Sequence, residues 1–322
     1  MAVATGSQKT ASCGRQKILG TILVNRPLCR EHFRLDLLVP SFAPTEPGNF
    51  VQLHCRDPLE DTDPEPIDWQ PGQRVALHDA DLLSPQAMLA RPFSLAGRED
   101  TPDGVVLSVI HRVVGTGTAW LAELCQGDRL SVLGPLGNQF TLPPEGGLAI
   151  LAGGGVGIPP MLYLAQRLRS RQAIAFCGAT TRDLLPLHIT GESCNRGDNI
   201  EPRLTIAEFA DCGIPSVITT DDGSYGVGGY VTQALERYVD ARTSERSFHP
   251  TIYTCGPELM MRRVAEIATQ RDLPCQVAVE RAMACGMGTC QSCVIKVKVG
   301  DGWRYRLSCT DGPVFCASEL LW

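Results

Sequence analysis

The chain has 322 residues, which is too long for one ordinary hydrophobic core and predicts two or three domains. Its 43% hydrophobic and 20% charged residues are typical of a soluble globular protein. The net charge of −6 excludes the basic footprint of a nucleic-acid-binding protein and is compatible with a cytoplasmic enzyme.

The N-terminus and the apolar stretches indicate neither export nor a membrane span. Residues 1–17 are polar and lack the apolar segment of a signal peptide, and we expect residues 1–16 to form a disordered tail. Residues 148–166 carry no charge, but the glycines and prolines in their middle would break a spanning helix. A strand, a tight loop and a helix explain this stretch better.

Residues 17–144 contain short β-rich segments separated by glycine and proline, which predicts an antiparallel barrel. The expected strands are residues 17–24, 33–39, 49–54, 74–78, 105–113 and 129–133. Residues 57–68 contain six acidic residues, three prolines and no basic residue. This composition indicates a solvated loop without a catalytic role.

Two segments of this half carry groups that suit a flavin nucleotide. Residues 91–94, R-P-F-S, offer a guanidinium for a pyrophosphate, an aromatic ring to pack on the flavin, and a hydroxyl for a ring nitrogen. Residues 115–118, G-T-G-T, follow the strand expected at 105–113. Taken alone, the R-P-F-S segment is better explained as a surface turn, so the flavin hypothesis depends on the rest of the chain.

Residues 145–274 alternate between apolar strands and helices, which predicts a parallel sheet. A strand at 148–152 leads into the glycine-rich turn 153–157, and a helix begins at the two prolines 159–160. Free amides at this helix start suit a pyrophosphate, and glycines let it approach. Because Ile158 occupies the third position of a G-x-G-x-x-G fingerprint, a purely structural turn is the alternative.

Further strands are expected at 173–177, 216–220 and 251–255, with helices at 231–241 and 258–271. Ligands of parallel sheets bind at the carboxyl ends of the strands, so we expect a nicotinamide dinucleotide there. The candidate binding residues are Gly153, Gly154, Gly155, Gly157, Cys255, Gly256 and Pro257. Thr220 and Asp221 lie at another such end.

Residues 275–322 contain the most specific pattern in the chain. The ligand candidates Cys285, Cys290, Cys293 and Cys309 follow the spacing C-x4-C-x2-C-x15-C, which is that of plant-type [2Fe–2S] proteins. Glycines at 286 and 288 permit the unusual backbone angles of a loop that wraps a cluster. In a chain without a signal peptide, clustered cysteines indicate metal ligands before disulfides.

Zinc and inert thiols are the alternatives to a cluster. Zinc ribbons usually carry two C-x2-C-like pairs, and this segment has one. Four inert structural cysteines would have no reason to gather so tightly. Cys316 competes with Cys309 for the position of the fourth ligand, and spacing alone does not separate the two.

The motifs occur in a characteristic order. R-P-F-S and G-T-G-T come first, then G-G-G-V-G-I-P-P, T-D-D-G-S-Y-G and C-G-P, and last E-R-A-M-A-C-G-M-G-T-C-Q-S-C and C-T-D-G-P-V-F. This order resembles the electron-transfer subunit of NAD-dependent (class 1B) dihydroorotate dehydrogenase, within the ferredoxin–NADP reductase superfamily. The resemblance covers about residues 17–318. It implies that Cys309, which opens the closing motif, is the fourth ligand.

The resemblance implies an FAD-binding barrel over residues 17–144, an NAD-binding α/β domain over 145–274 and a [2Fe–2S] subdomain over 275–322. The residues that it assigns to FAD are Arg91, Pro92, Phe93, Ser94, Ile110, His111, Arg112, Gly117 and Thr118. Relatives usually have tyrosine where His111 stands. The loops at 57–68 and 188–200 are extra segments relative to many relatives.

The implied function is electron transfer in de novo pyrimidine (UMP) biosynthesis. Electrons would pass from an FMN-containing catalytic subunit, in an expected heterotetramer, through [2Fe–2S] and FAD to NAD+. No acid–base or nucleophilic residue is expected, and the histidines are expected to be structural. Arg182 and Asp183 follow the strand at 173–177 as a mixed pair of charges, and the resemblance favours NAD over NADP.

Two other hypotheses fit the same motifs. The first is a reductase subunit of a sulfide dehydrogenase, an NADPH:ferredoxin oxidoreductase or an oxygenase system. The second is a non-catalytic, zinc-binding module that retains the fold. The colour of the purified protein separates the second hypothesis from a flavin and iron–sulfur protein, and the identity of the partner separates the first.

Overall fold

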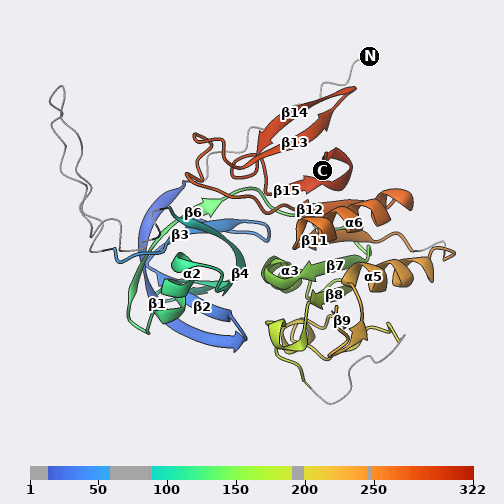
Figure 1. The fold of residues 1–322 in the computed structure, drawn as a ribbon, viewed down its shortest axis with the longest axis horizontal. Helices are drawn as coiled ribbons and strands as arrows, with labels where there is room; N and C mark the ends of the chain where they lie inside the picture. Colours follow the sequence, from blue (N-terminus) through green and yellow to red (C-terminus); the bar gives the residue numbers. More distant parts are fainter. Residues whose placement is uncertain (1–13, 59–86, 88, 191–198, 246–247) are drawn as a thin grey trace.

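The computed structural model describes residues 14–58, 87, 89–190, 199–245 and 248–322. These residues form a closed barrel, a seven-stranded sheet with helices on both faces, and a two-stranded hairpin that projects from the body (Figure 1). The expected antiparallel barrel and parallel-sheet domain are confirmed. In the described part of the chain, no helix is long and apolar enough to cross a membrane.

The barrel follows the strand order β1-β2-β5-β4-β3-β6. Its strands are β1 (Gln16–Cys29), β2 (His32–Val39), β3 (Phe50–His54), β4 (Arg91–Thr101), β5 (Gly104–Arg112) and β6 (Arg129–Leu136). Alternation along β2 sends Leu35, Leu37 and Val39 into the barrel core. Asp36 lies between them on the outer face, where it accepts hydrogen bonds from Arg34 and Ser108.

Two elements of the barrel half differ from expectation. Residues 91–94 begin strand β4, whereas the sequence predicted no strand there. The strand was not predicted because Pro92 and the charged residues 98–100 interrupt the apolar alternation. Residues 115–118 lead into helix α2 (Thr116–Glu123), which covers one end of the barrel through the buried Leu121. The strand expected at 74–78 and most of the acidic loop at 57–68 lie outside the described residues.

The large sheet follows the order β10-β9-β8-β7-β11-β12-β15. Its strands are β7 (Ala149–Gly154), β8 (Ala173–Ala179), β9 (Ser216–Thr220), β10 (Val227–Gly228), β11 (Thr251–Cys255), β12 (Cys275–Ala278) and β15 (Val314–Cys316). The sheet is buried on both faces. Leu151 packs on the side of helix α3 (Ile158–Arg167), whereas Ile150 packs on the side of α5 (Val231–Asp240) and α6 (Glu258–Gln270). The short helix α4 (Ala207–Ala210) packs with α3.

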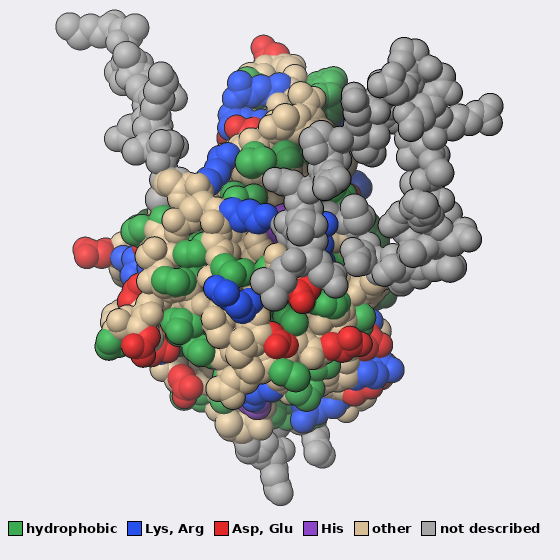
Figure 2. Space-filling model, turned by 90° about the vertical axis from the view of Figure 1, so that its left-hand side faces the viewer, with side chains coloured by type: hydrophobic (Ala, Val, Ile, Leu, Met, Phe, Trp, Pro, Cys, Tyr) green, Lys and Arg blue, Asp and Glu red, His purple; other side chains and the backbone are tan. Residues whose placement is uncertain are grey.

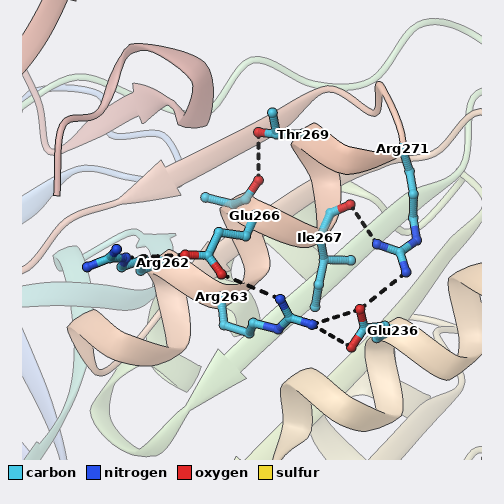
Figure 3. A network of polar contacts seen from close by, with 8 residues as sticks. Glu236, Arg262, Arg263, Glu266, Ile267, Thr269 and Arg271 are labelled. Carbon is cyan, nitrogen blue, oxygen red and sulfur yellow. Dashed lines mark hydrogen bonds and ion pairs between the residues drawn. The ribbon is translucent and has the colours of Figure 1, made fainter.

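An ionic network joins α5 to α6 (Figure 3). Nη2 of Arg263 donates to both carboxylate oxygens of Glu236 at 2.8 Å, and Nη2 of Arg271 donates to the same carboxylate at 3.2 Å. Glu266 pairs with Arg262 and Arg263 along α6. The network fixes the side chain of Arg263 at the edge of the sheet.

The C-terminal segment is divided between the sheet and the projecting hairpin. Strand β12, which lies beyond residue 274, pairs in parallel with β11, and β15 pairs antiparallel with β12. The sheet therefore crosses the domain boundary expected at residue 275. Between these strands lie the cysteine loop and the hairpin of β13 (Val294–Val299) and β14 (Gly302–Leu307).

The barrel and the sheet domain share a continuous core. Ala96 of β4 and Ile110 of β5 are buried with Met161 of α3. The hydroxyl of Tyr163 donates to the carbonyl oxygen of Thr45 at 2.8 Å. Helix α3 thus fixes the carboxyl edge of the sheet relative to the outer face of β4 and β5.

Candidate functional site

The cysteine loop has the geometry of a sulfur-binding turn. Gly286 and Gly288 adopt φ values of +66° and +86°, which glycine tolerates and other residues rarely adopt. The backbone amides of Met287 and Cys290 both donate to Sγ of Cys285 at 3.4 Å. The loop therefore already directs amides toward a thiolate, as a loop that stabilises an anionic cluster must do.

Pairwise contacts place the four predicted ligands in one region: the Cys290 amide contacts the Cys285 sulfur, and Cys309 packs beside Cys293. Burial raises the pKa of Cys309 to about 12, and the adjacent Cys293 and Cys285 sulfurs act in the same direction. Hydrogen bonds, chiefly from Ser292, lower the pKa of Cys290 to about 6. Within the described residues, no three His, Cys, Asp or Glu side chains converge as ligands of one ion. A dinuclear cluster does not require this, because each iron takes two of the four cysteines.

Cys316 lies apart from this group. It is exposed on β15, opposite Gln276 of β12, and its Sγ lies 3.1 Å from the hydroxyl of Ser318. Cys309, in contrast, is buried with Cys293 in a small apolar cluster. The geometry favours Cys309 as the fourth ligand.

The cysteine loop is seated directly on the barrel. Phe50 of β3 and Leu136 of β6 pack with Cys293 and Cys309. The buried amide of Gln52 donates to the carbonyl oxygen of Ala284 at 3.3 Å. A side chain at 286 would collide with Gln52, so glycine is required for this close approach.

A second connection joins the end of β6 to the segment after the fourth cysteine. The backbone amide of Asn138 donates to Gly312 O at 2.6 Å, and its side-chain oxygen accepts from the amide of Val314 at 2.8 Å. The loop that carries the first three cysteines and the segment that follows the fourth are therefore both held against the barrel at strands β3 and β6.

The predicted flavin residues lie on both faces of strands β4 and β5. Pro92, Ser94, Ile110 and Arg112 alternate with residues of the barrel core, so their side chains lie on the outer face, toward the sheet domain. Ser94 pairs with Phe50 of β3, one strand away from the cysteine loop. This outer face is the part of the barrel that could receive a flavin ring.

Phe93 and His111 have the opposite orientation. The His111 ring stacks on Phe33 and meets the edge of Phe93, on the same face as the core residue Val109. Because successive side chains of a strand point to opposite faces, Ile110, His111 and Arg112 cannot all contact the same ligand through their side chains. Only the backbone of His111 is available on the outer face, because its imidazole points toward the barrel core.

His111 is nevertheless chemically unusual. Both of its ring nitrogens are buried and have no partner among the described residues. Burial, and secondarily the neighbouring His32, lower its pKa to about 4. The imidazole is therefore neutral at physiological pH. His32 donates from Nδ1 to Arg30 O at 2.9 Å, which leaves its buried Nε2 as an acceptor.

The remaining predicted FAD residues lie at one end of the barrel. The hydroxyl of Thr118 donates to Gly115 O and accepts from the amides of Val114 and Gly115, so it serves as a helix cap. Gly117 lies in the first turn of α2 against Cys55. Arg91 donates from Nη1 to Leu89 O at 2.7 Å. The Thr118 hydroxyl is therefore occupied by backbone groups and is not free to bind a phosphate.

A pocket of about 600 Å³ opens at the carboxyl edge of the sheet. Of the seven predicted dinucleotide residues, Gly154, Gly155 and Pro257 line it. The other four support its shape. Most clearly, a Cβ at Gly157 would overlap the backbone carbonyl of Cys255, so only glycine lets the turn pack on the C-G-P segment.

Much of the pocket wall was not predicted. The additional lining residues are His32, Val156, Gly178, Ala179, Thr180, Leu184, Asp221, Tyr230, Val231, Thr232, Leu259, Met260, Arg263 and Glu280. Arg112, which was predicted to bind FAD, lines this pocket as well. The sequence analysis placed Asp221 at the carboxyl end of a strand but did not include it among the candidate binding residues. His32 and Arg112 come from the barrel, so their contribution depends on how the domains pack.

The charges in the pocket are largely compensated. Arg112 pairs with Glu31 at 2.8 Å, and Arg263 pairs with Glu236 at the same distance. Desolvation raises the pKa of Asp221, assisted by Asp222, and it also raises that of Glu280. Arg182 and Asp183 are not among the lining residues, because Arg182 stacks over Tyr225 and Asp183 pairs with Arg30 of the barrel.

Comparison with known proteins places this arrangement in one family. Residues 280–321 match the family model for the iron–sulfur cluster binding domain of dihydroorotate dehydrogenase B. The chain is 38% identical to the electron transfer subunit of dihydroorotate dehydrogenase B (NAD(+)) from Bacillus caldolyticus, over 78% of this chain and 87% of that protein. The subunit from Desulforamulus reducens is 33% identical over the same shares.

The fold has a close counterpart among solved structures. The NADH-dependent reduced ferredoxin-NADP oxidoreductase, described for flavin-based electron bifurcation, superposes with a TM-score of 0.67 and 25% identity. The match covers 94% of this chain and 90% of that chain. Because relatives above 30% identity are matched over most of their length, the chain belongs to the family of electron transfer subunits of NAD(+)-dependent dihydroorotate dehydrogenase B.

Proposed function

We propose that this chain carries electrons from the FMN-containing catalytic subunit of dihydroorotate dehydrogenase, through a [2Fe–2S] cluster and FAD, to NAD+, in the synthesis of UMP. The observation that carries the proposal is the seating of the four-cysteine loop on β3, the strand paired with the R-P-F-S segment of β4. The dinucleotide pocket opens between the barrel and the sheet, and takes Arg112 from β5, the strand that pairs with β4.

The residues fit the groups that this function needs. Cys285, Cys290, Cys293 and Cys309 supply four thiolates, and the amides of the loop stabilise their charge. When bound, a flavin exchanges electrons singly with an iron–sulfur centre and in pairs with a nicotinamide. The partly exposed outer face at Pro92 and Ser94 would orient the flavin ring, and the neighbouring contact of Ala96 and Ile110 with α3 would exclude water from one side of it.

The dinucleotide would be held mainly by backbone. Gly154 and Gly155 present amides without side chains at the start of α3, where a pyrophosphate is favoured. The wall formed by Tyr230, Val231 and Met260 is apolar and suits the rings of the cofactor. No side chain needs to form a covalent bond, so we assign no catalytic nucleophile.

The partner and its stoichiometry complete the proposal. An electron transfer subunit requires a catalytic subunit, and we propose that the two form a heterotetramer in the cytoplasm. The test is co-expression of both chains from the native host, followed by co-purification and an assay of dihydroorotate-driven NAD+ reduction. We expect activity only with both chains present. Failure of the two chains to associate, together with no reduction of this chain by the dihydroorotate-reduced partner, would refute the function.

A second candidate is favoured by the structural counterpart. The ferredoxin-NADP oxidoreductase likeness spans nearly the whole of both chains. Under that alternative, the native partner recovered with this chain would not oxidise dihydroorotate, and reduced ferredoxin would reduce the chain. The same co-purification therefore separates the two candidates.

A further inference from the structure

The β13–β14 hairpin has one buried face and one uncovered face. Ile295 and Val297 of β13 point into the core formed by β12, β15 and α6. Strand alternation and the pairing register place the other set on the opposite face. We call this the outer face, and its residues are Val294, Lys296, Lys298, Trp303, Tyr305 and Leu307.

The outer face exposes large aromatic side chains. Trp303 is 52% exposed and Tyr305 is 61% exposed, and their rings meet edge to face at 5.2 Å. Nζ of Lys296 lies 4.1 Å from the centre of the Trp303 ring. Exposed tryptophan and tyrosine, held in place by neighbours, are typical of the centres of protein interfaces.

The charge of the hairpin is opposite to that of the chain. Strands β13 and β14 and their turn contain four basic residues and one acid, Asp301, whereas the whole chain carries −6. Of these bases, Lys296 and Lys298 lie on the outer face, whereas Arg304 and Arg306 are paired with Val297 and Ile295 on the opposite face. Lys and Arg gather with hydrophobic side chains on the upper part of the molecule in Figure 2, where the hairpin projects. The outer face itself carries two lysines and no acidic residue, which fits a partner surface with an apolar centre and acidic surroundings.

The outer face runs directly to the cysteine loop. Cys293 immediately precedes β13, and Cys309 follows β14 by two residues. Leu307, at the inner end of the outer face, packs with both cysteines. Met287, within the loop, is 54% exposed. A protein docked on this face would bring its own redox centre near the cysteine loop, as one-electron transfer requires.

We propose that the outer face of the β13–β14 hairpin is the surface on which the FMN-containing catalytic subunit docks, through an apolar patch rimmed by acidic residues. The inference rests on the proposed function and deepens it. Trp303 and Tyr305 supply the apolar anchors, and the lysines orient the encounter.

Matched variants test the proposal in the full-length chain, loaded with its cofactors. Tyr305→Ala removes an anchor, and Leu204→Ala is its control, since Leu204 is 57% exposed elsewhere on the sheet domain. Lys298→Glu reverses a charge on the outer face, and Arg169→Glu reverses an exposed charge after α3. Affinity for the purified catalytic subunit is measured by calorimetry at two salt concentrations. Cluster absorbance and NADH oxidation with an artificial acceptor report folding.

We expect Tyr305→Ala and Lys298→Glu to weaken association at least tenfold, with the Lys298→Glu effect shrinking at high salt. The controls should stay within twofold of wild type. Association within twofold for both hairpin variants would overturn the docking surface while leaving the function intact. If only self-association of this chain were lost, the occupant would be a second copy and the inference would fail. If the wild-type chain did not bind the catalytic subunit, the proposed function and this inference would fall together.

Discussion

The cysteine loop and the dinucleotide pocket are built in opposite ways. The loop gathers four sulfurs from 25 residues of sequence, and each sulfur is chemically required. The pocket takes its wall from the ends of several strands, the starts of three helices and two barrel residues, and much of it is backbone. A site made of local, indispensable side chains should fail completely on one substitution, whereas a site made of backbone should fail by degrees.

The strongest test of this contrast is removal of the fourth thiol. Cys309→Ser should abolish the cluster, because Cys309 is buried beside Cys293 and no other thiol lies there to replace it among the described residues. Iron content should fall from about two per chain toward zero, and the [2Fe–2S] EPR signal should be lost. Cys316→Ser is the matched control and should retain both. The reverse pattern would show that Cys316 is the ligand.

The same contrast explains what the sequence revealed. The cysteine spacing and its glycines are local, so the ligand set could be proposed without a fold. Strand β4 was missed because Pro92 and the charges after Gly97 conceal it, and helix α2 was missed because its start resembles a turn. His32 and Arg112 reach the pocket only through domain packing, which no local pattern encodes.

The barrel wall between the two regions gives a pH-dependent test. Burial lowers the pKa of His111 to about 4, from 6.5, so the folded chain favours the neutral imidazole. The neutral His111 therefore contributes fully to the free energy of unfolding above pH 6.5. As the pH falls toward 4, the free energy of unfolding should decrease by roughly 3 kcal/mol at most. His111→Phe should flatten the acid side of the stability curve, measured by urea unfolding. The exposed His249→Gln is the control, and an unchanged acid slope in His111→Phe would contradict the assignment.

Flavin retention should respond to Arg91, the first residue of β4, at one end of the barrel. Arg91→Ala removes a charge-assisted contact to a pyrophosphate, worth about 1.5–3 kcal/mol, or roughly 10- to 150-fold in the dissociation constant. The measurement is FAD release on dilution, followed by flavin fluorescence. The exposed Arg169→Ala should leave release unchanged. Full occupancy of Arg91→Ala at low free FAD would argue against a pyrophosphate at this position.

The backbone of the pocket should fail gradually. An alanine side chain at Gly157 would overlap the Cys255 carbonyl and force the glycine turn away from the C-G-P segment. We expect a loss of about 1–3 kcal/mol in the free energy of unfolding, together with weaker NADH binding and an intact cluster spectrum. Gly302→Ala, where no positive φ is present and the nearest atom lies 3.8 Å from the added Cβ, controls for the change from glycine to alanine without a collision. Equal NADH affinity in the two variants would remove Gly157 from the architecture of the pocket.

The smallest expected effect concerns the choice of nicotinamide. A 2′-phosphate needs an unpaired cation, but both arginines that line the described pocket, Arg112 and Arg263, are held by carboxylates. Asp221 adds negative charge at the end of β9, where it would accept a ribose hydroxyl and repel a phosphate. We therefore expect kcat/KM for NADH to exceed that for NADPH about tenfold, measured with an artificial acceptor.

The source of this preference can be separated within one pair of neighbours. Asp221→Asn should narrow the ratio of the two kcat/KM values by raising the value for NADPH, because the repulsion is removed while a polar group remains. Asp222→Asn should leave the ratio unchanged, since Asp222 is bound to Ser224 and does not line the pocket. Equal or better use of NADPH by the wild-type chain would contradict the preference, and would favour the ferredoxin-linked alternative. A ratio that is high but insensitive to Asp221→Asn would instead place the discrimination in the shape of the backbone, consistent with a pocket that no single side chain controls.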